Sequence, residues 1–245
     1  MEKAEKNSRI RSAITQRIAG FQGLVQRFLK EILIALTLAV VAAIAVEVYN
    51  SETRKNDIEI NRKATATILA FDKDGNLLSQ GSGVFISATR LLVTNYHVIQ
   101  GADIGKTLAK LSSCAFYRLK TPKGLNKASD LALLEFDATE TPHVKGLGDS
   151  DALLSGQRVV AIGSPLSLEN SVSEGVIANP ARRLHGLNFI QFTASISPGS
   201  SGGGLYDDHG KAIGITSATL RGEGNTAQDL NLAGSHKPRK RRAYG

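Results

Sequence analysis

The chain begins with one long apolar stretch and then changes to short alternating segments. Residues 32–46, ILIALTLAVVAAIAV, contain no charged side chain, and apolar residues extend the stretch in both directions to residues 28–49. A helix that spans a bilayer needs about 20 predominantly apolar residues. A buried core helix is the competing interpretation, but the stretch has no polar face and its neighbours are charged. The pattern therefore predicts a transmembrane helix over residues 28–49.

The charges around this helix predict its orientation. Residues 1–27 are basic, and positive segments stay on the cytoplasmic side of a membrane. Ala43-Ile44-Ala45 matches the small-residue pattern of a signal peptidase site. We favour an uncleaved signal anchor, because the region before the apolar stretch is unusually long for a cleaved signal. The alternative is cleavage near Ala45, which would release a secreted or periplasmic protein.

The rest of the chain predicts an all-β domain. Residues 50–63 are polar and are interpreted as a linker, and the domain would run over residues 64–235. Short β-rich segments alternate there with Gly, Asn and Asp, which indicates antiparallel sandwiches or barrels rather than βα units. The predicted strands are residues 64–71, 81–87, 90–96, 131–136, 158–163, 189–194 and 212–218.

Charge and cysteine content narrow the classes of protein further. The formal net charge is +8, but residues 1–30 and 236–245 carry +5 each, which leaves −2 for residues 31–235. A nucleic-acid-binding domain places a basic surface on its folded body, so we expect no nucleic-acid partner. We expect the basic tail, residues 236–245, to be disordered. Cys114 is the only cysteine, so the fold forms no intramolecular disulfide.

The glycine-rich segment SPGSSGGGL, residues 197–205, carries the strongest chemical signal. A serine nucleophile needs a tight turn, which glycines permit, and backbone N–H groups aimed at the developing oxyanion. We assign Ser201 as the nucleophile and the N–H groups of Gly199 and Ser201 as the oxyanion hole. A flexible Ser/Gly linker is the alternative, but strand-like segments flank the motif on both sides.

Two further motifs supply the partners that a serine nucleophile needs. His97 follows a predicted strand in TNYHVI, and histidine suits a general base near neutral pH. Asp130 opens the apolar segment 131–136, where it would be buried against the Nδ1–H of the histidine. Each residue alone is unremarkable. The order His, Asp, Ser is that of chymotrypsin-type barrels, and it differs from the orders in α/β-hydrolases and subtilisins.

The segments beside the nucleophile predict the substrate-binding wall. Ala194 and Ser195 are small and no acidic residue is near them, so we expect small or aliphatic side chains at the residue before the scissile bond. No cluster of residues suggests a metal or nucleotide site, and we expect no cofactor. The predicted wall comprises Ser195, Ile196, Ser197, Ile213, Gly214, Ile215, Thr216 and Ser217.

Taken together, these motifs resemble the HtrA/Deg-type branch of trypsin-like serine proteases over about residues 64–233. The resemblance implies two six-stranded antiparallel β-barrels, with His97 and Asp130 in the first and Ser201 in the second. It also implies a serine endopeptidase in the bacterial cell envelope that acts on protein substrates in quality control. The segments that carry it are residues 81–87, 94–102, 129–136, 158–178, 191–207 and 229–233.

The chain also departs from the pattern of that family. Gly204 stands where the family usually has proline. We expect it to loosen the loop that carries Ser201, here called the serine loop. Only 44 residues follow Ser201, too few for a PDZ domain, and the tail matches no family segment, so we expect a truncated end. A catalytically weak or inactive fold that serves as an anchored binding module is therefore the alternative function. The sequence leaves open whether the chain forms a homo-oligomer.

Overall fold

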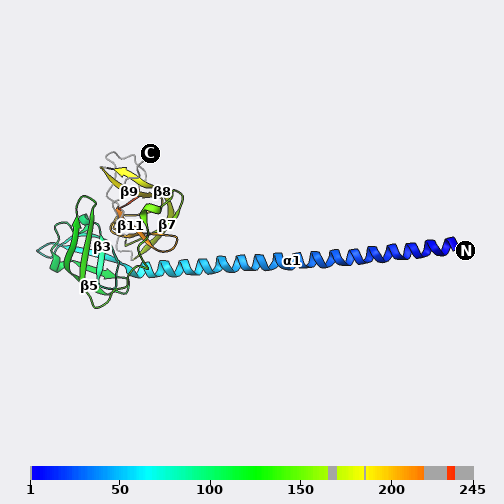
Figure 1. Cartoon of the computed structure of the whole chain (residues 1–245). Coiled ribbons are helices and arrows are strands. Elements are labelled where there is room, and N and C mark those ends of the chain that lie inside the picture. Colours follow the sequence, from blue (N-terminus) through cyan, green and yellow to red (C-terminus); the bar gives the residue numbers. More distant parts are fainter. Residues whose placement is uncertain (1, 165–169, 185, 218–230, 235–245) are drawn as a thin grey trace. The chain divides into compact units, whose positions relative to one another are not determined.

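The computed structural model describes residues 2–164, 170–184, 186–217 and 231–234. The chain divides into two units, Met1–Thr53 and Arg54–Gly245. Helix α1 (Glu2–Ala64) makes up the first unit and continues into the second (Figure 1). The predicted basic tail, residues 236–245, lies outside the described residues.

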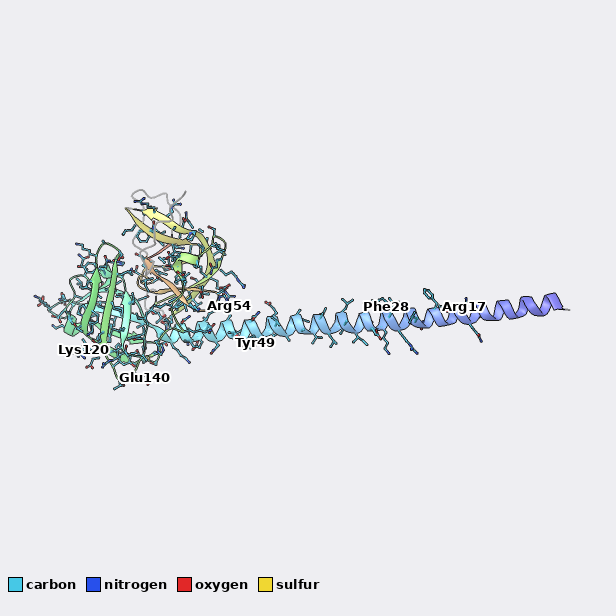
Figure 2. The ribbon with its side chains drawn as sticks, in the orientation of Figure 1. Arg17, Phe28, Tyr49, Arg54, Lys120 and Glu140 are labelled. Carbon is cyan, nitrogen blue, oxygen red and sulfur yellow. The ribbon has the colours of Figure 1, made fainter. Side chains whose placement is uncertain are left out.

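The first unit presents its apolar side chains to its surroundings. Leu33 is 65% exposed and Ile44 is 59% exposed, and side chains such as Phe28 and Tyr49 project from α1 (Figure 2). Contiguous apolar surface of this extent is rare on a soluble monomer and marks a contact with lipid or protein. Among the described residues, the part of α1 over Thr15–Ala64 is long and apolar enough to cross a membrane, a test that a signal sequence also passes. A core helix would bury its apolar residues, whereas those of this segment are exposed.

The second unit contains two closed antiparallel barrels, each with six described strands. In the first barrel the strands follow the order β1-β2-β3-β6-β5-β4, and its core includes Phe85 and Phe136, whose rings meet edge to face at 5.9 Å. Two short helices, α2 (Tyr96–Ile99) and η1 (Ile104–Lys106), follow β3. Its strands are β1 (Thr65–Phe71), β2 (Leu77–Phe85), β3 (Leu91–Thr94), β4 (Leu108–Leu111), β5 (Phe116–Asn126) and β6 (Leu131–Asp137).

The second barrel repeats this arrangement, with the strand order β10-β11-β12-β9-β8-β7. Its core includes Ile177, Phe192, Leu205 and Ile213. The short helix η2 (Ser150–Ala152) precedes it. Its strands are β7 (Arg158–Gly163), β8 (Ser171–Leu184), β9 (Leu187–Phe192), β10 (Gly204–Asp207), β11 (Ala212–Ser217) and β12 (Asn231–Gly234). The prediction of two six-stranded antiparallel barrels is confirmed.

A third apolar cluster holds the two barrels together. It combines Val84 of the first barrel with Val160 and Tyr206 of the second and with Ala64 at the end of α1. Because buried apolar area is the main favourable term in packing, this cluster fixes the barrels against each other. The loops that carry His97, Asp130 and Ser201 are therefore brought together by apolar packing elsewhere in the unit.

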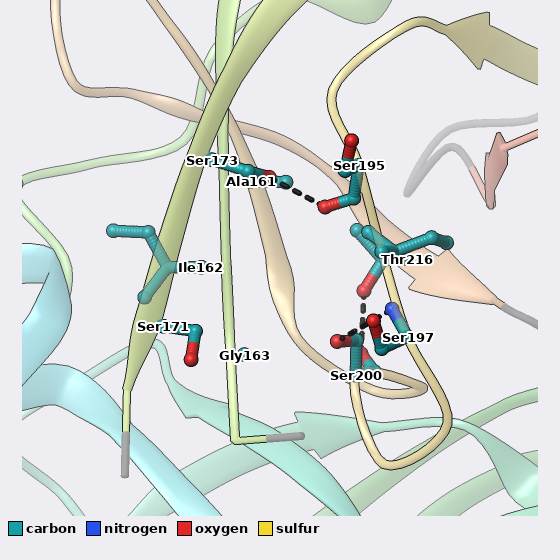
Figure 3. A pocket seen from close by; sticks show the side chains of 10 residues that line it. Ala161, Ile162, Gly163, Ser171, Ser173, Ser195, Ser197, Ser200 and Thr216 are labelled. Carbon is teal, nitrogen blue, oxygen red and sulfur yellow. Dashed lines mark hydrogen bonds between the residues drawn. The ribbon is translucent and has the colours of Figure 1, made fainter. Parts of the chain in front are cut away.

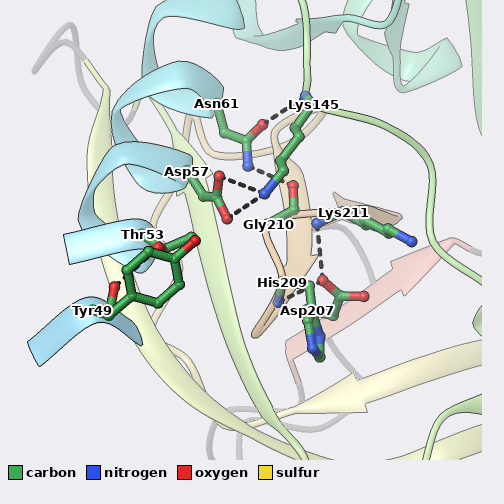
Figure 4. A network of polar contacts seen from close by, with 9 residues as sticks. All are labelled: Tyr49, Thr53, Asp57, Asn61, Lys145, Asp207, His209, Gly210 and Lys211. Carbon is green, nitrogen blue, oxygen red and sulfur yellow. Dashed lines mark hydrogen bonds and ion pairs between the residues drawn. The ribbon is translucent and has the colours of Figure 1, made fainter. Parts of the chain in front are cut away.

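Residues 50–63, predicted as a linker, form the last turns of α1. Asp57 and Asn61, one turn apart on the helix, are buried. Both Asp57 carboxylate oxygens lie 2.8 Å from Lys145 Nζ, and Asn61 Nδ2 donates to the Gly210 carbonyl at 2.8 Å (Figure 4). A polar composition suggested solvent, but these polar groups are satisfied by partners in the barrel unit, so the helix can dock there.

Candidate active site

The structure brings His97 and Asp130 into direct contact. His97 lies in α2, immediately after β3, and Asp130 lies immediately before β6, which pairs with β3. His97 Nδ1 is 2.7 Å from Asp130 Oδ2, and the His97 main-chain N–H donates to Asp130 Oδ1 at 3.0 Å. Both carboxylate oxygens therefore hold the same histidine. This contact fixes the orientation of the imidazole ring.

The backbone of Asp130 is held as tightly as its side chain. Its φ is +53°, in the left-handed region, which aspartate tolerates better than most residues. Its carbonyl accepts hydrogen bonds from the Tyr96 N–H at 3.1 Å and from Asn95 Nδ2 at 2.9 Å. These bonds keep the strained turn in place, so the carboxylate points at His97. The Asp130 side chain is 29% exposed, less buried than the sequence predicts.

The serine loop packs directly on the first barrel. The Ser82 N–H of β2 donates to the Ser201 carbonyl at 2.7 Å, and the Gly202 N–H donates to the Thr216 carbonyl at 2.9 Å. Gly202 has a φ of +89°, and a Cβ atom there would lie 2.0 Å from the Ser82 carbonyl oxygen. Only glycine fits this close approach, which explains the glycine that follows Ser201.

A hydroxyl at the end of β11 links the second barrel to the His97–Asp130 pair. Ser217 Oγ donates to Asp130 Oδ2 at 3.4 Å, a long hydrogen bond. Asp130 therefore receives contacts from both barrels. The structure places this carboxylate, His97 and the Ser201 loop at the junction of the two barrels.

The prediction that Gly204 loosens the serine loop is wrong. Gly204 begins β10, pairs with Ile215 and Ile162, and is buried. A Cβ atom at Gly204 would lie 2.3 Å from the Tyr206 hydroxyl oxygen and 2.4 Å from its Cζ. The ring of Tyr206, which is fully buried, occupies the space that a larger residue 204 would need. Burial raises the pKa of the Tyr206 hydroxyl well above its usual range, so it stays neutral.

A cavity of about 250 Å³ lies beside the serine loop (Figure 3). Hydroxyl groups and apolar side chains line it, and none of the lining residues that the structure describes is charged. One wall is the segment before Ser201, where Thr216 Oγ1 donates to the Ser200 carbonyl at 2.7 Å. The lining residues are Ala161, Ile162, Gly163, Ser171, Ser173, Ser195, Ile196, Ser197, Ser200 and Thr216.

This cavity includes only part of the substrate wall predicted from the sequence. Ser195, Ile196, Ser197 and Thr216 line it, whereas Ile213 is fully buried in the core of the second barrel. The side chain of Ile213 is therefore not available to contact a substrate. The other three predicted residues do not line the cavity: Gly214 lies in the middle of β11, Ile215 lies in the cluster between the barrels, and Ser217 contacts Asp130.

The sequence prediction missed the residues that β7 and β8 contribute to this cavity. Ala161, Ile162 and Gly163 end β7, and Ser171 and Ser173 begin β8. These residues lie in the segment 158–178, which resembles the HtrA/Deg-type family but contains no residue whose type indicates catalysis or binding. A cavity wall made of small side chains is defined by the three-dimensional contact of distant segments, so residue type alone does not reveal it.

In the described part of the chain, one exposed group has the donor atoms for a metal. Side-chain atoms of Asp207, Asp208 and His209 lie within 4.8 Å of one another. Asp207 Oδ1 accepts hydrogen bonds from the main-chain N–H groups of His209 and Lys211, as an ordinary turn residue does. His209 Nδ1 lies 2.8 Å from Asp208. The group is explained by its turn and supports no metal role.

Two six-stranded barrels with a His–Asp pair and a serine loop at their junction define the chymotrypsin-like class of serine proteases. The family model for the trypsin-like peptidase domain matches residues 81–215, more than half of the chain. The chain therefore belongs to the trypsin-like peptidase domain family.

Similar proteins place the chain near the HtrA/Deg-type branch of that family. A probable periplasmic DegP-like serine endoprotease of Marinomonas sp. (strain MWYL1) is 40% identical over 148 residues, 59% of this chain and 31% of that protein. A relative from Pseudomonas fluorescens is 40% identical over 149 residues, 60% of this chain and 30% of that protein. The match thus spans about a third of the length of these curated relatives. The resemblance predicted from the sequence motifs is confirmed.

Solved structures agree with this placement. The HtrA-type protease AlgW, solved with a tripeptide, has a TM-score of 0.63 and 31% identity, and the match covers 75% of this chain and 60% of that one. The serine endoprotease from Yersinia pestis has a TM-score of 0.63 and 26% identity, with 74% and 62% covered.

Proposed function

We propose that this chain is a serine endopeptidase that cleaves protein substrates through an acyl-enzyme on Ser201. The observation that carries the proposal is the double contact between His97 and Asp130, at 2.7 and 3.0 Å, beside a serine loop bonded to the same barrel. An inactive binding module would have no need for a carboxylate that orients the histidine ring. We therefore favour catalysis over the anchored binding module.

In the proposed reaction, His97 Nε2 takes the proton from Ser201 Oγ as this oxygen attacks the peptide carbonyl. Asp130 accepts the Nδ1–H hydrogen bond and stabilises the imidazolium that forms. The N–H groups of Gly199 and Ser201 stabilise the oxyanion, where loss of one donor typically costs about 10²–10³ in rate. His97 then protonates the leaving amine, and water hydrolyses the acyl ester. The reaction as proposed draws only on side chains and amides of this chain.

We propose that the cavity beside the serine loop receives the side chain that precedes the scissile bond. The described residues of its walls are uncharged, and Ile162 and Ile196 give it apolar surface. A charged side chain would lose its hydration there without gaining a partner of opposite charge. Small or aliphatic residues should therefore precede the cleavage sites, and mapping the peptides released from casein by mass spectrometry tests this preference.

We further propose that residues 28–49 anchor the protease in the inner membrane, with the barrels in the periplasm. The exposed apolar surface of α1 and the basic residues 1–27 support this topology. The periplasmic DegP-like relatives support the compartment. N-terminal sequencing of the mature protein tests the anchor, because a chain that starts at Val46 would show cleavage after Ala45 instead.

Hydrolysis of casein by the full chain in detergent micelles tests the proposed activity. Asp130→Asn preserves the shape of the side chain but favours the wrong histidine tautomer, and it should lower kcat by about 10⁴. Ser201→Ala should remove nearly all turnover and leave only a small residual activity above the uncatalysed rate. If the wild type cleaves no faster than Ser201→Ala, the binding-module function is the correct one.

A further inference from the structure

We infer that Ser82, Ser164 and Asn170 form a hydrogen-bonded relay that positions the oxyanion-hole segment from behind. The relay runs from the end of α1 to Gly199, and Ser82 lies 82 residues before Ser164 in the sequence, whereas Asn170 lies six residues after it. They are positioning residues, because their side chains bind the Gly199 carbonyl, one another's segment and the Arg62 carbonyl. This inference rests on the proposed function, in which the Gly199 and Ser201 amides bind the oxyanion.

Ser82 holds the carbonyl groups on both sides of the proposed Ser201 donor. Its Oγ donates to the Gly199 carbonyl at 2.7 Å, and its main-chain N–H donates to the Ser201 carbonyl at 2.7 Å. The Ser82 carbonyl in turn accepts from Thr94 Oγ1 at 2.6 Å. Ser82 lies in β2 and is fully buried, so these bonds tie the serine loop to a rigid strand.

The peptide between Gly199 and Ser200 is held at both of its ends. Ser82 Oγ binds its carbonyl, and its N–H donates to the Ser197 carbonyl at 2.9 Å. Gly199 has a φ of +94°, a conformation that glycine can also leave easily because many other φ values are open to it. Fixing this peptide plane therefore sets the orientation of the neighbouring Gly199 N–H, the first proposed oxyanion donor.

Ser164 and Asn170 connect Ser82 to the end of α1. The Ser164 N–H donates to Ser82 Oγ at 2.8 Å, and Ser164 Oγ donates to Asn170 Oδ1 at 3.1 Å. Asn170 Nδ2 donates to the Arg62 carbonyl at 2.9 Å. Arg62 lies in the last turn of α1, whose carbonyls have no partner within the helix, so Asn170 caps the helix end.

The main-chain groups of the relay fix the direction of its side-chain hydrogen bonds. A carbonyl only accepts, so the Arg62 oxygen requires the amide nitrogen of Asn170, and the amide oxygen must then face Ser164. A main-chain N–H only donates, so Ser82 Oγ accepts from Ser164 and its own proton is left for Gly199. Because each hydroxyl has one proton, loss of the Ser82 or the Ser164 side chain removes the relay's donor to the Gly199 carbonyl or to Asn170 Oδ1.

The backbone of Asn170 is also built for this role. Its φ is +52°, a left-handed conformation that asparagine adopts more readily than most residues, and it is 5% exposed. Asn170→Gly keeps that conformation without strain and removes only the amide. This substitution therefore separates the relay from the backbone shape, which Asn170→Ala would not do.

The test measures hydrolysis of a chromogenic peptide by the full chain in detergent micelles. Loss of an oxyanion donor costs about 10²–10³ in kcat, so misplacing one should cost less. We expect Ser82→Ala to lower kcat by about 10–100-fold, and Ser164→Ala and Asn170→Gly by about 3–10-fold. KM should stay within twofold of the wild-type value. The shape of the pH–rate profile should not change, because the His97–Asp130 pair is untouched. Ser150→Ala, at another fully buried serine, is the matched control and should leave kcat unchanged.

Amide hydrogen exchange of residues 197–203 gives a second readout that needs no catalysis. This segment should exchange faster in Asn170→Gly and Ser164→Ala than in the wild type and in Ser150→Ala. The relay would be overturned if kcat in these two variants equals that of the wild type or falls no more than in Ser150→Ala. Unchanged amide exchange of residues 197–203 would overturn it as well. Both results can be obtained even if Ser82→Ala fails to fold. A wild type without Ser201-dependent hydrolysis would instead refute the proposed function, and the exchange rates would then decide the relay alone.

Discussion

The Asp57–Lys145 ion pair should respond very differently to the loss of each partner. The Asp57 side chain is 5% exposed, whereas the Lys145 side chain is 44% exposed, and the ammonium lies 2.8 Å from both carboxylate oxygens. Lys145→Met would leave a carboxylate buried without its cation. Asp57→Asn would leave an ammonium that can turn into water. The two substitutions break the same contact but leave unlike groups behind.

These environments set the expected magnitudes. Removing one partner so that the other stays buried and charged costs about 3–5 kcal/mol, and we expect about 3 for Lys145→Met because the site borders solvent. Losing only a charge-assisted hydrogen bond costs about 1–2 kcal/mol, the value expected for Asp57→Asn. For a unit of this size, 1 kcal/mol shifts Tm by about 2–4 °C. The Lys145→Met protein should therefore melt about 2–8 °C below the Asp57→Asn protein.

Thermal unfolding of the full chain in detergent, followed by the near-ultraviolet circular dichroism of the tyrosines, measures this difference. The double variant should be more stable than Lys145→Met alone, since it no longer buries an unpaired charge. Equal Tm values for the two single variants, or a lower Tm for Asp57→Asn, would refute the reasoning. Such a result would mean that the end of α1 does not bury Asp57 against the barrel.

Two further predictions concern the serine loop and the first barrel. Gly202→Ala should destabilise the protein by about 3 kcal/mol or more, because the new Cβ atom would clash with the Ser82 carbonyl. Gly156 has a φ of +84° and open space around it, so Gly156→Ala should cost only about 1–2 kcal/mol. Equal losses of Tm in the two variants would contradict this prediction. A hydrogen bond from Lys123 is the main cause that lowers the pKa of Glu135. The stabilisation from this bond is present above the pKa of glutamate in the unfolded chain, about 4.3, and is lost as pH falls through the lowered pKa of the folded protein. The Tm of Lys123→Met should therefore lie below that of the wild type at pH 7, and the two Tm values should converge in acid. A Tm difference that stays constant with pH would contradict the second prediction.

The sequence predicted seven apolar strands and missed two long polar strands, as well as the short strands β4, β10 and β12. The segments predicted at 131–136 and 158–163 match β6 and β7 closely. The two longest strands, β5 and β8, were not predicted, because both are largely exposed and each contains a proline. Register shifts next to Pro122 and Pro180 accommodate these residues in the ladders. Such bulges depend on the partner strand, which local residue patterns do not show.

The candidate site was predictable only where its chemistry follows from short motifs. His97, Asp130 and Ser201 each stand in a recognisable segment, and their order along the chain narrowed the class of protein. In β11 all six residues are buried, so alternation could not tell that Ile213 faces the barrel core. The partners of Asp57 and of Asn170 lie 88 and 108 residues away along the chain. A polar residue with a distant buried partner has the same local sequence as one in solvent, and for that reason the composition of residues 50–63 predicts a linker.

The central claim is that Ser201, and not the adjacent Ser200, is the activated nucleophile. Ser200 faces the cavity wall, where its Oγ accepts from the Ser197 N–H at 3.4 Å. Labelling the full chain with a fluorophosphonate, followed by peptide mass spectrometry, tests this most directly. The adduct should map to Ser201 in the wild type and in Ser200→Ala, and it should be absent from Ser201→Ala and strongly reduced in His97→Ala. Equal labelling of the wild type and Ser201→Ala, or an adduct on Ser200, would contradict the assignment.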